Sequence, residues 1–571
     1  MSKGTARARA GSLSGGPVVV LACLLGCGLS PALRAQEMEH RHAARPAEGS
    51  RLGTVAFPNS GAPGAQAPFV RGIALLHSFE YDDAAAAFQQ AERADPAFAL
   101  PYWFEAFTHS HLLWGEDDSD SARAVLRRLA PTPEARLARA ATARERSYGA
   151  AIEAFFADTT EAVRARAFAD SMTALAGRDS SDLEASAFAA LGSLLALSSG
   201  GYARDQRQAA EARAIDLASR VFRLEPQHPG APHYLIHVTD LDPSFATRAL
   251  PAARAYSRIA PESEHALHMP SHVFLPLGLW DDVASSNERA WAASRHYVAE
   301  HHLSGADLDF HSLWFLEYAY LQQGRWRAAR ALLDTTRAVL AGADLAGAEH
   351  VDAQYARAQL AALYAGETGR WSAAVAPPST PATFANHREM FFALDAEQSR
   401  LVAAAGRGDT AALAAGAGAL RAHADSMDMP PMKRWMNMNA LKLEALVARG
   451  RGQNERAIEL AREASEIEDL YPPVGPAALP VARELLGELL LAGGHAAEAA
   501  QQYELVLTHL PNRSAALLGL ARARAATGDS SAATQAYRRL LASWHAADGD
   551  LPALPEVRRG ARGAGMSVST R

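Results

Sequence analysis

A recurring interval of 34 residues is the feature that most restricts the fold of this chain. Near the C-terminal end, positions 8, 15, 20, 24 and 32 of one interval are occupied by Gly487, Gly494, Ala499, Tyr503 and Pro511. In the next interval, positions 8, 15, 20 and 24 are occupied by Ala521, Gly528, Ala533 and Tyr537. Small residues at 8 and 20 let two helices approach, the glycine at 15 permits a turn, and the proline ends the second helix. The interval therefore predicts helix pairs, with Gly487 at a crossing and Gly494 at a turn.

The same frame returns upstream. It fits Gly72, Tyr81, Ala84, Phe88, Ala91 and Pro96, then Ala249, Tyr256 and Pro261, then Gly278, Trp280, Asn287 and Ala290, then Gly324, Trp326 and Ala329. This arrangement resembles the tetratricopeptide repeat (TPR). We expect an all-α fold, in which TPR-type helix pairs stack into a right-handed superhelical solenoid with a concave groove. Irregular spacers are expected at about residues 115–215 and 372–436.

Charge and motifs argue against several classes of function. The net charge of -7 is unsuited to a protein that binds nucleic acid through its phosphates. The chain has no P-loop, no GxGxxG and no GxSxG pattern, so nucleotide binding and seryl acyl-enzyme chemistry have no support.

The first 35 residues have the features of a signal peptide. Basic residues precede a short apolar run at 17–25, and Ala35 offers a cleavage point. We therefore expect a periplasmic or secreted protein with no membrane span in the mature chain. The alternatives are a lipoprotein anchored through Cys27 and an uncleaved anchor.

The whole chain is expected to divide into five segments. These are a signal peptide at 1–35, a flexible linker at 36–68, an N-terminal array with a His-rich groove at 69–345, a C-terminal array at 346–545 and a disordered tail at 546–571. Both cysteines, Cys23 and Cys27, lie in the first segment. A mature chain without them has no thiolate, so His, Asp and Glu are its remaining metal ligands.

Histidines are concentrated between residues 228 and 311, in HPGAPHYLIH, EHALHMPSH and DLDFHSLW. His233 and His237 are four residues apart, and so are His268 and His272. Residues at this spacing share one face of a helix. Because the two pairs are 35 residues apart, about one repeat, they are expected side by side on neighbouring helices.

Two further histidines, His265 and His311, fall at position 2 of successive units, on the first-helix surface that faces the concave groove of TPR proteins. We therefore predict that the two HxxxH pairs hold one divalent ion in the groove, with His265 or His311 as a further ligand. The candidate ligands are His233, His237, His265, His268, His272 and His311. Neutral imidazole suits Zn, Fe and Cu. Nearby carboxylates are expected to complete the shell or orient the rings: Asp240, Glu264 and Asp309.

The alternative is that these histidines pack at helix interfaces and that no cofactor is bound. Neither HxxxH sequence is HExxH, so the helix of the metalloproteases is absent. Pro270 lies inside the second pair and is expected to kink the helix. A smaller group, His77, His109 and His111, lies beside aromatic residues; it is interpreted as part of a helix interface, and the alternative is the lining of a ligand pocket.

Several sequence segments resemble those of a group of bacterial TPR proteins, among them GIALLHSFEYDDAAAAFQQAERADP, HPGAPHYLIHVTD and HALHMPSHVF. The resemblance covers roughly residues 68–335. It implies the repeat fold and no particular activity.

Two functions of different classes follow. The first is a scaffold in the cell envelope that binds a peptide or protein partner in its concave groove, as repeat folds commonly do. The alternative is a divalent-metal-binding protein or metalloenzyme with a His-rich site at 228–311. Whether the protein is an enzyme stays open at this point.

Export makes a direct prediction. Mass spectrometry of the protein from the cell envelope is expected to find a mature N-terminus near Gln36. A diacylated peptide beginning at Cys27 would indicate the lipoprotein instead, and an intact Met1 would contradict export.

Overall fold

The computed structural model describes residues 52–563, except 112, 114–115, 262, 346–349, 376–386, 427–429 and 470–474. The predicted signal peptide and the first part of the predicted linker lie outside the described residues. The described part is almost entirely helical, and its one strand pair is short: β1 (Ser110–His111) runs antiparallel to β2 (Glu116–Asp117). None of the described helices combines the length and the apolar character that crossing a membrane requires.

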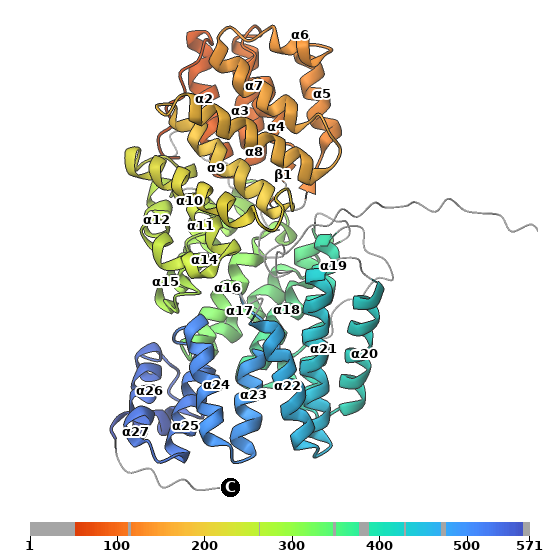
Figure 1. Ribbon diagram of the computed structural model, residues 1–571. Coiled ribbons are helices and arrows are strands. Elements are labelled where there is room, and N and C mark those ends of the chain that lie inside the picture. Colours follow the sequence, from red (N-terminus) through yellow and green to blue (C-terminus); the bar gives the residue numbers. More distant parts are fainter. Residues whose placement is uncertain are drawn as a thin grey trace, which may run out of the picture.

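Most successive helices lie side by side and run in opposite directions along the described part of the chain (Figure 1). The N-terminal part consists of α2 (Pro63–His77), α3 (Tyr81–Ala94), α4 (Leu100–Phe107), α5 (Ser119–Leu129), α6 (Pro133–Leu137), α7 (Ala143–Phe155), α8 (Glu161–Arg178), α9 (Leu183–Ser198) and α10 (Arg207–Leu224). The middle consists of α11 (Gly230–Leu241), η2 (Pro243–Phe245), α12 (Ala246–Ile259), α13 (Glu264–His268), α14 (Ser271–Phe274), α15 (Trp280–Glu300), η3 (Gly305–Asp307), α16 (Phe310–Gln322) and α17 (Trp326–Val339). The C-terminal part consists of α18 (Val351–Thr368), η5 (Trp371–Ala373), α19 (His387–Gly406), α20 (Thr410–Ser426), α21 (Pro430–Gly450), α22 (Asn454–Glu468), α23 (Ala482–Ala492), α24 (Ala496–His509), α25 (Ser514–Ala526), α26 (Ser530–Ser543) and α27 (Leu554–Ala561).

The predicted all-α solenoid of TPR-type helix pairs is confirmed. The C-terminal repeats show how the recurring spacing of small residues produces the helix crossings and turns. A Cβ atom on Gly487 would lie 2.8 Å from the Tyr503 ring, so α23 and α24 cross where the glycine was predicted. Gly494 has a φ of +85°, a left-handed conformation that glycine adopts without strain, and it forms the turn. The glycines at positions 8 and 15 therefore have the predicted roles.

Three expected boundaries differ from the structure. Phe57, in the predicted linker, is buried and packs edge-on against Phe69 at 5.3 Å. In the predicted tail, α27 buries Leu554 and Val557 against the last repeat, because an array needs its terminal apolar face covered. The described residues of the stretches expected as irregular spacers form α5 to α10 and α19 to α21.

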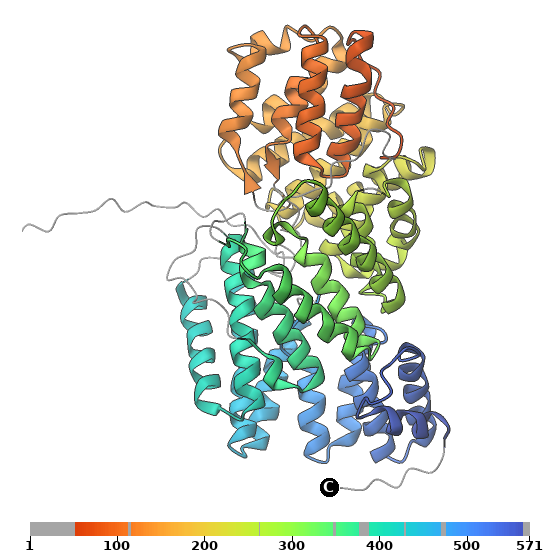
Figure 2. The same cartoon turned by 180° about the vertical axis from the view of Figure 1, so that it is seen from behind.

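The array also closes on itself. Figures 1 and 2 show the last helices, α24 to α27 in blue, below α16 and α17 in green. The Trp280 Nε1–H donates to the carbonyl of Asn512 at 2.9 Å, and the Ser514 N–H donates to Gln322 Oε1 at 3.0 Å. Gly278 permits the contact, since it has a φ of +62° and a Cβ there would lie 1.7 Å from the Pro511 carbonyl oxygen. The end of the chain is therefore held against its middle.

This closure gives a stability prediction. Gly278→Ala should lower the free energy of unfolding by roughly 2–4 kcal/mol, because it combines left-handed strain with a clash against backbone. Gly494→Ala is the matched control: its φ is also positive, but a Cβ there meets nothing within 4 Å, so roughly 1–2 kcal/mol is expected. Urea unfolding followed by circular dichroism measures both. Equal losses would show that the closure contributes little.

Candidate metal centre

The six histidines singled out from the sequence come together in the interior of the middle region. His233 and His237 belong to α11, His265 and His268 to α13, His272 to α14 and His311 to α16. None of the six side chains is more than 3 % exposed. They are therefore enclosed between helices.

The first group contains His233, His237 and His265. The Nε2 atom of His233 lies 3.0 Å from Nε2 of His237 and 2.8 Å from Nε2 of His265. We call this group the first triad. The Nε2 atoms of its three imidazoles therefore face one another.

The second group, the second triad, contains His268, His272 and His311. The Nε2 atoms of His268 and His272 are 2.9 Å apart. One ring nitrogen of each of the three residues lies within 4.8 Å of the others. Phe315 packs against all three rings, with centroids 4.9–5.1 Å apart, so the group is also sealed by an aromatic side chain.

Pro270 interrupts the helix between His268 and His272, yet the pair keeps its geometry. α13 ends at His268 and α14 begins at Ser271. The chain continues through the break as a helical turn, since the N–H of Phe274 donates to the carbonyl of Pro270 at 3.1 Å. The expected kink therefore leaves both rings on one side.

The structure differs from the predicted site in two respects. The ligand atoms form two groups of three, not one group of four with an additional ligand. The groups are buried and do not line an open groove. Both differences arise because each first-helix surface is covered by the next helix pair, so His265 and His311 each join the HxxxH pair that precedes them in the chain.

The other nitrogen of four of these rings is held by a hydrogen-bond acceptor. His233 Nδ1–H donates to the carbonyl of His77 at 2.8 Å. His268 Nδ1–H donates to Asn287 Oδ1 at 2.6 Å, and Asn287 is oriented because its Nδ2 donates to the carbonyl of Val283. These acceptors require the proton on Nδ1 and leave a lone pair on Nε2.

Asp240 provides the remaining two acceptors. His237 Nδ1 lies 3.0 Å from Asp240 Oδ2, and His272 Nδ1 lies 2.7 Å from Asp240 Oδ1. Burial opposes ionisation of Asp240, but the charge and hydrogen bonds of His272 and His237 hold the pKa of this carboxyl well below its usual range. An ionised carboxylate accepts only, so both rings carry their proton on Nδ1.

This pattern leaves lone pairs facing each other. When these rings are neutral, the Nε2 atoms of His233 and His237 in the first triad are both acceptors at 3.0 Å, and those of His268 and His272 in the second are both acceptors at 2.9 Å. Two acceptors at this distance repel. A positive charge between them, carried by a metal ion or a shared proton, removes the repulsion. Burial lowers the pKa of His311 to about 3, which keeps this ring neutral and able to donate a lone pair.

The predicted carboxylates have different roles. Asp240 is the shared acceptor just described. Glu264 is buried, and burial together with neighbouring Asp309 raises the pKa of its carboxyl well above the usual range. Asp309 caps α16 by accepting the backbone N–H groups of His311 and Ser312, both at 3.0 Å. Asp240 thus orients two of the rings, and Asp309 supports the helix that carries His311.

A third buried group, which sequence reasoning did not find, joins His77, Glu184 and His228. Glu184 Oε2 lies 2.9 Å from His77 Nε2, and Glu184 Oε1 lies 3.2 Å from His228 Nε2. Here His228 Nδ1 accepts the N–H of Ala231, so its Nε2 carries the proton and donates to Glu184. His77 Nδ1 can accept from the Tyr234 hydroxyl at 2.7 Å. Every partner is complementary, so this group is a satisfied network and needs no ion.

The smaller histidine group contributes to an interface, as expected. His77 belongs to the network above. His111 stacks on Tyr81 with ring centroids 3.9 Å apart, and its Nε2 bonds the carbonyl of Thr108.

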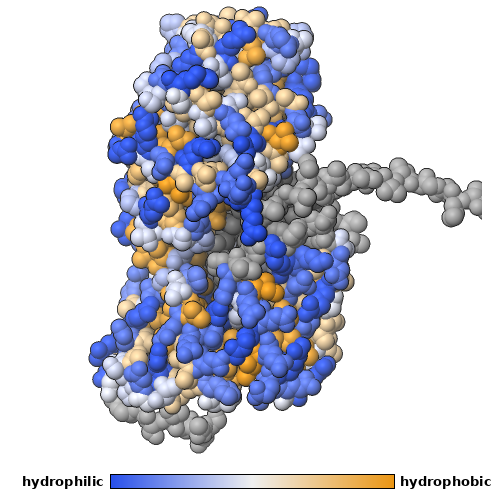
Figure 3. Space-filling view, viewed as in Figure 1, coloured by the Kyte–Doolittle hydropathy of each residue, from blue (hydrophilic) through white to orange (hydrophobic). Residues whose placement is uncertain are grey.

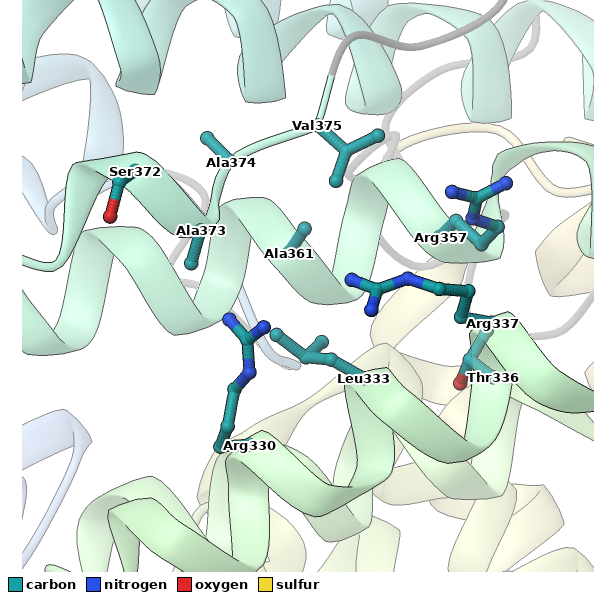
Figure 4. A pocket seen from close by; sticks show the side chains of 10 residues that line it. All are labelled: Arg330, Leu333, Thr336, Arg337, Arg357, Ala361, Ser372, Ala373, Ala374 and Val375. Atoms are coloured by element: carbon teal, nitrogen blue, oxygen red, sulfur yellow. The ribbon is translucent and has the colours of Figure 1, made fainter.

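An arginine-lined cavity is a weaker candidate site. It measures about 120 Å³ and lies between α17, α18 and η5 (Figure 4). Arg330, Arg337 and Arg357 contribute guanidinium groups, but Asp334 pairs with the first two at 3.7 and 3.3 Å.

On the face shown in Figure 3, hydrophobic and hydrophilic residues are interspersed.

Comparison with known proteins gives a likeness of fold. No protein-family model matches the chain, and no curated protein matches it. Solved structures that match include the APC/C hetero-tetramer Cut9–Hcn1, with 11% identity over 82% of this chain and 78% of that chain and a TM-score of 0.32. Human IFIT1 with m7Gppp-AAAA has 13% identity over 79% and 90% and a TM-score of 0.34. Yeast Tom70 has 12% identity over 87% and 95% and a TM-score of 0.26. Similarity at this level does not bear on function.

The Glu184 network makes a pH prediction. Burial opposes its ionisation, but His228 and His77 lower the Glu184 pKa to about 2. Because an unfolded glutamate titrates at about 4.3, this group stabilises the fold above that pH, and the contribution is lost as pH falls toward 2. Glu184→Gln should therefore cost roughly 3 kcal/mol at pH 7 and progressively less between pH 4 and pH 2. Urea unfolding across this range measures it.

The control is Glu459→Gln, since the Glu459 side chain is 65% exposed. It should change the free energy of unfolding by less than about 0.5 kcal/mol at any pH. A Glu184→Gln penalty that does not depend on pH would contradict the proposed ionisation.

Proposed function

We propose that the protein binds two transition-metal ions, one in each histidine triad, within a helical repeat scaffold. The observation that carries the proposal is the pair of facing Nε2 acceptors in each triad, 3.0 and 2.9 Å apart. Buried acceptors set their tautomers, so as long as all four rings are neutral no placement of their protons makes these contacts favourable.

The distances suit a first-row divalent ion. Nitrogen ligands about 2.0–2.1 Å from a tetrahedral ion lie about 3.3 Å from one another. The Nε2 separations of 3.0 and 2.8 Å in the first triad and 2.9 Å in the second need to widen by a few tenths of an ångström, and the remaining ligand nitrogens lie within 4.8 Å of one another. Three neutral imidazoles without thiolate favour Zn, Cu, Ni or Fe, and they leave a fourth coordination position.

The repeat fold fits a protein-interaction scaffold, but no contact favours a particular partner. In the closure, the last repeats contact the middle of the same chain, through the hydrogen bond from Trp280 to Asn512. Buried, tautomer-fixed histidines are not needed to bind a peptide. The metal-binding function therefore takes first place, and export to the periplasm or beyond remains part of the proposal.

Metal content tests the proposal. The full chain, purified without chelator and freed of any affinity tag, is expected to contain or take up two equivalents of Zn²⁺ by elemental analysis and calorimetry. His237→Ala should reduce this to one by opening the first triad, and His272→Ala should do the same for the second. The double variant should bind none while its helicity is retained.

His296→Ala is the matched control. The His296 side chain is 81% exposed on α15, so the variant should still bind two equivalents. A wild-type protein that binds no ion would reject the proposal and identify the shared positive charge as a proton. Unchanged stoichiometry in the double variant would place any bound metal elsewhere.

A further inference from the structure

We infer that Asp240 is a positioning residue shared by the two metal sites, so that one side chain sets the metal-binding tautomer of a histidine in each. The inference rests on the proposed function, which it deepens: the two triads form one linked unit.

The geometry is specific to a carboxylate between two sites. Asp240 is 2% exposed near the C-terminal end of α11. Its Oδ2 lies 3.0 Å from Nδ1 of His237, one turn earlier on the same helix. Its Oδ1 lies 2.7 Å from Nδ1 of His272, 32 residues later on α14. Each oxygen therefore serves a different triad.

Only an ionised carboxylate can serve both rings in this way. It offers two acceptors and no donor, so both histidines must carry the proton on Nδ1 and expose the lone pair of Nε2. An asparagine has nearly the same shape but offers one acceptor and one N–H donor. The ring facing the amide N–H must accept at Nδ1, which puts its proton on Nε2, inside the triad, where it blocks the ion.

The test is Asp240→Asn in the full chain, titrated with Zn²⁺ by calorimetry and checked by elemental analysis after desalting. The variant should bind one equivalent where the wild type binds two. Asp242→Asn is the matched control: its carboxylate caps η2 by accepting the N–H of Ser244 at 2.9 Å and bonds no histidine of either triad. That variant should bind two equivalents.

Each result has a distinct meaning. Two equivalents in Asp240→Asn would overturn the inference, because the tautomers would then be set without Asp240. No bound metal would also overturn it, because the negative charge and not the hydrogen-bond pattern would be what both sites need. A wild-type protein without metal would reject the proposed function itself.

A double variant tests the same inference by a second route, with the folding of each protein checked by circular dichroism. In His272→Ala/Asp240→Asn the second triad is already lost, so the single amide oxygen is free to turn toward His237. This protein should bind one equivalent, like His272→Ala alone. Loss of that equivalent would contradict tautomer selection by Asp240.

Discussion

Four of the six imidazoles in the two triads bind a buried acceptor through one ring nitrogen, and this acceptor determines what the other nitrogen can do. The carbonyl of His77, the carboxylate of Asp240 and the amide oxygen of Asn287 lie on or beside α2, α11 and α15. They fix the direction of the Nε2 lone pairs before any ion is considered. Because buried polar groups without partners are costly, these hydrogen bonds also determine how the surrounding helices pack.

The N-terminal repeats take part in this arrangement although they carry none of the triad histidines. The side chain of His77 is held by Glu184, and its carbonyl is then available to His233. Two residues later, Phe79 adopts a φ of +59° and places its ring 4.3 Å from that of His233. The turn after α2 therefore positions and covers the first triad, and the satisfied network is its support.

Sequence periodicity was sufficient to predict the fold and to place the six histidines in one region, because helix pairing depends on small and aromatic residues at regular positions. Gly487 and Gly494 illustrate this, and the four-residue spacing of His233 and His237 correctly places both on one face. The division into two triads was beyond such reasoning. It depends on acceptors such as the His77 carbonyl, 156 residues from His233, and backbone carbonyls have no signature in sequence. The closure at Gly278 and the helix α27 were also beyond such reasoning, because contacts between residues far apart in the sequence determine the conformation of these segments.

The closure has a mechanical consequence. An open solenoid frays from its ends, because each terminal unit has one neighbour only. Here the last repeats have a second neighbour, since Ser514 and the backbone of Asp548 bond the end of α16 and the turn that follows it. α16 also carries His311. Detachment of the C-terminal helices would thus loosen the helix that completes the second triad. We therefore expect α16 and the last repeats to unfold as one cooperative unit, which protects the interior from local opening.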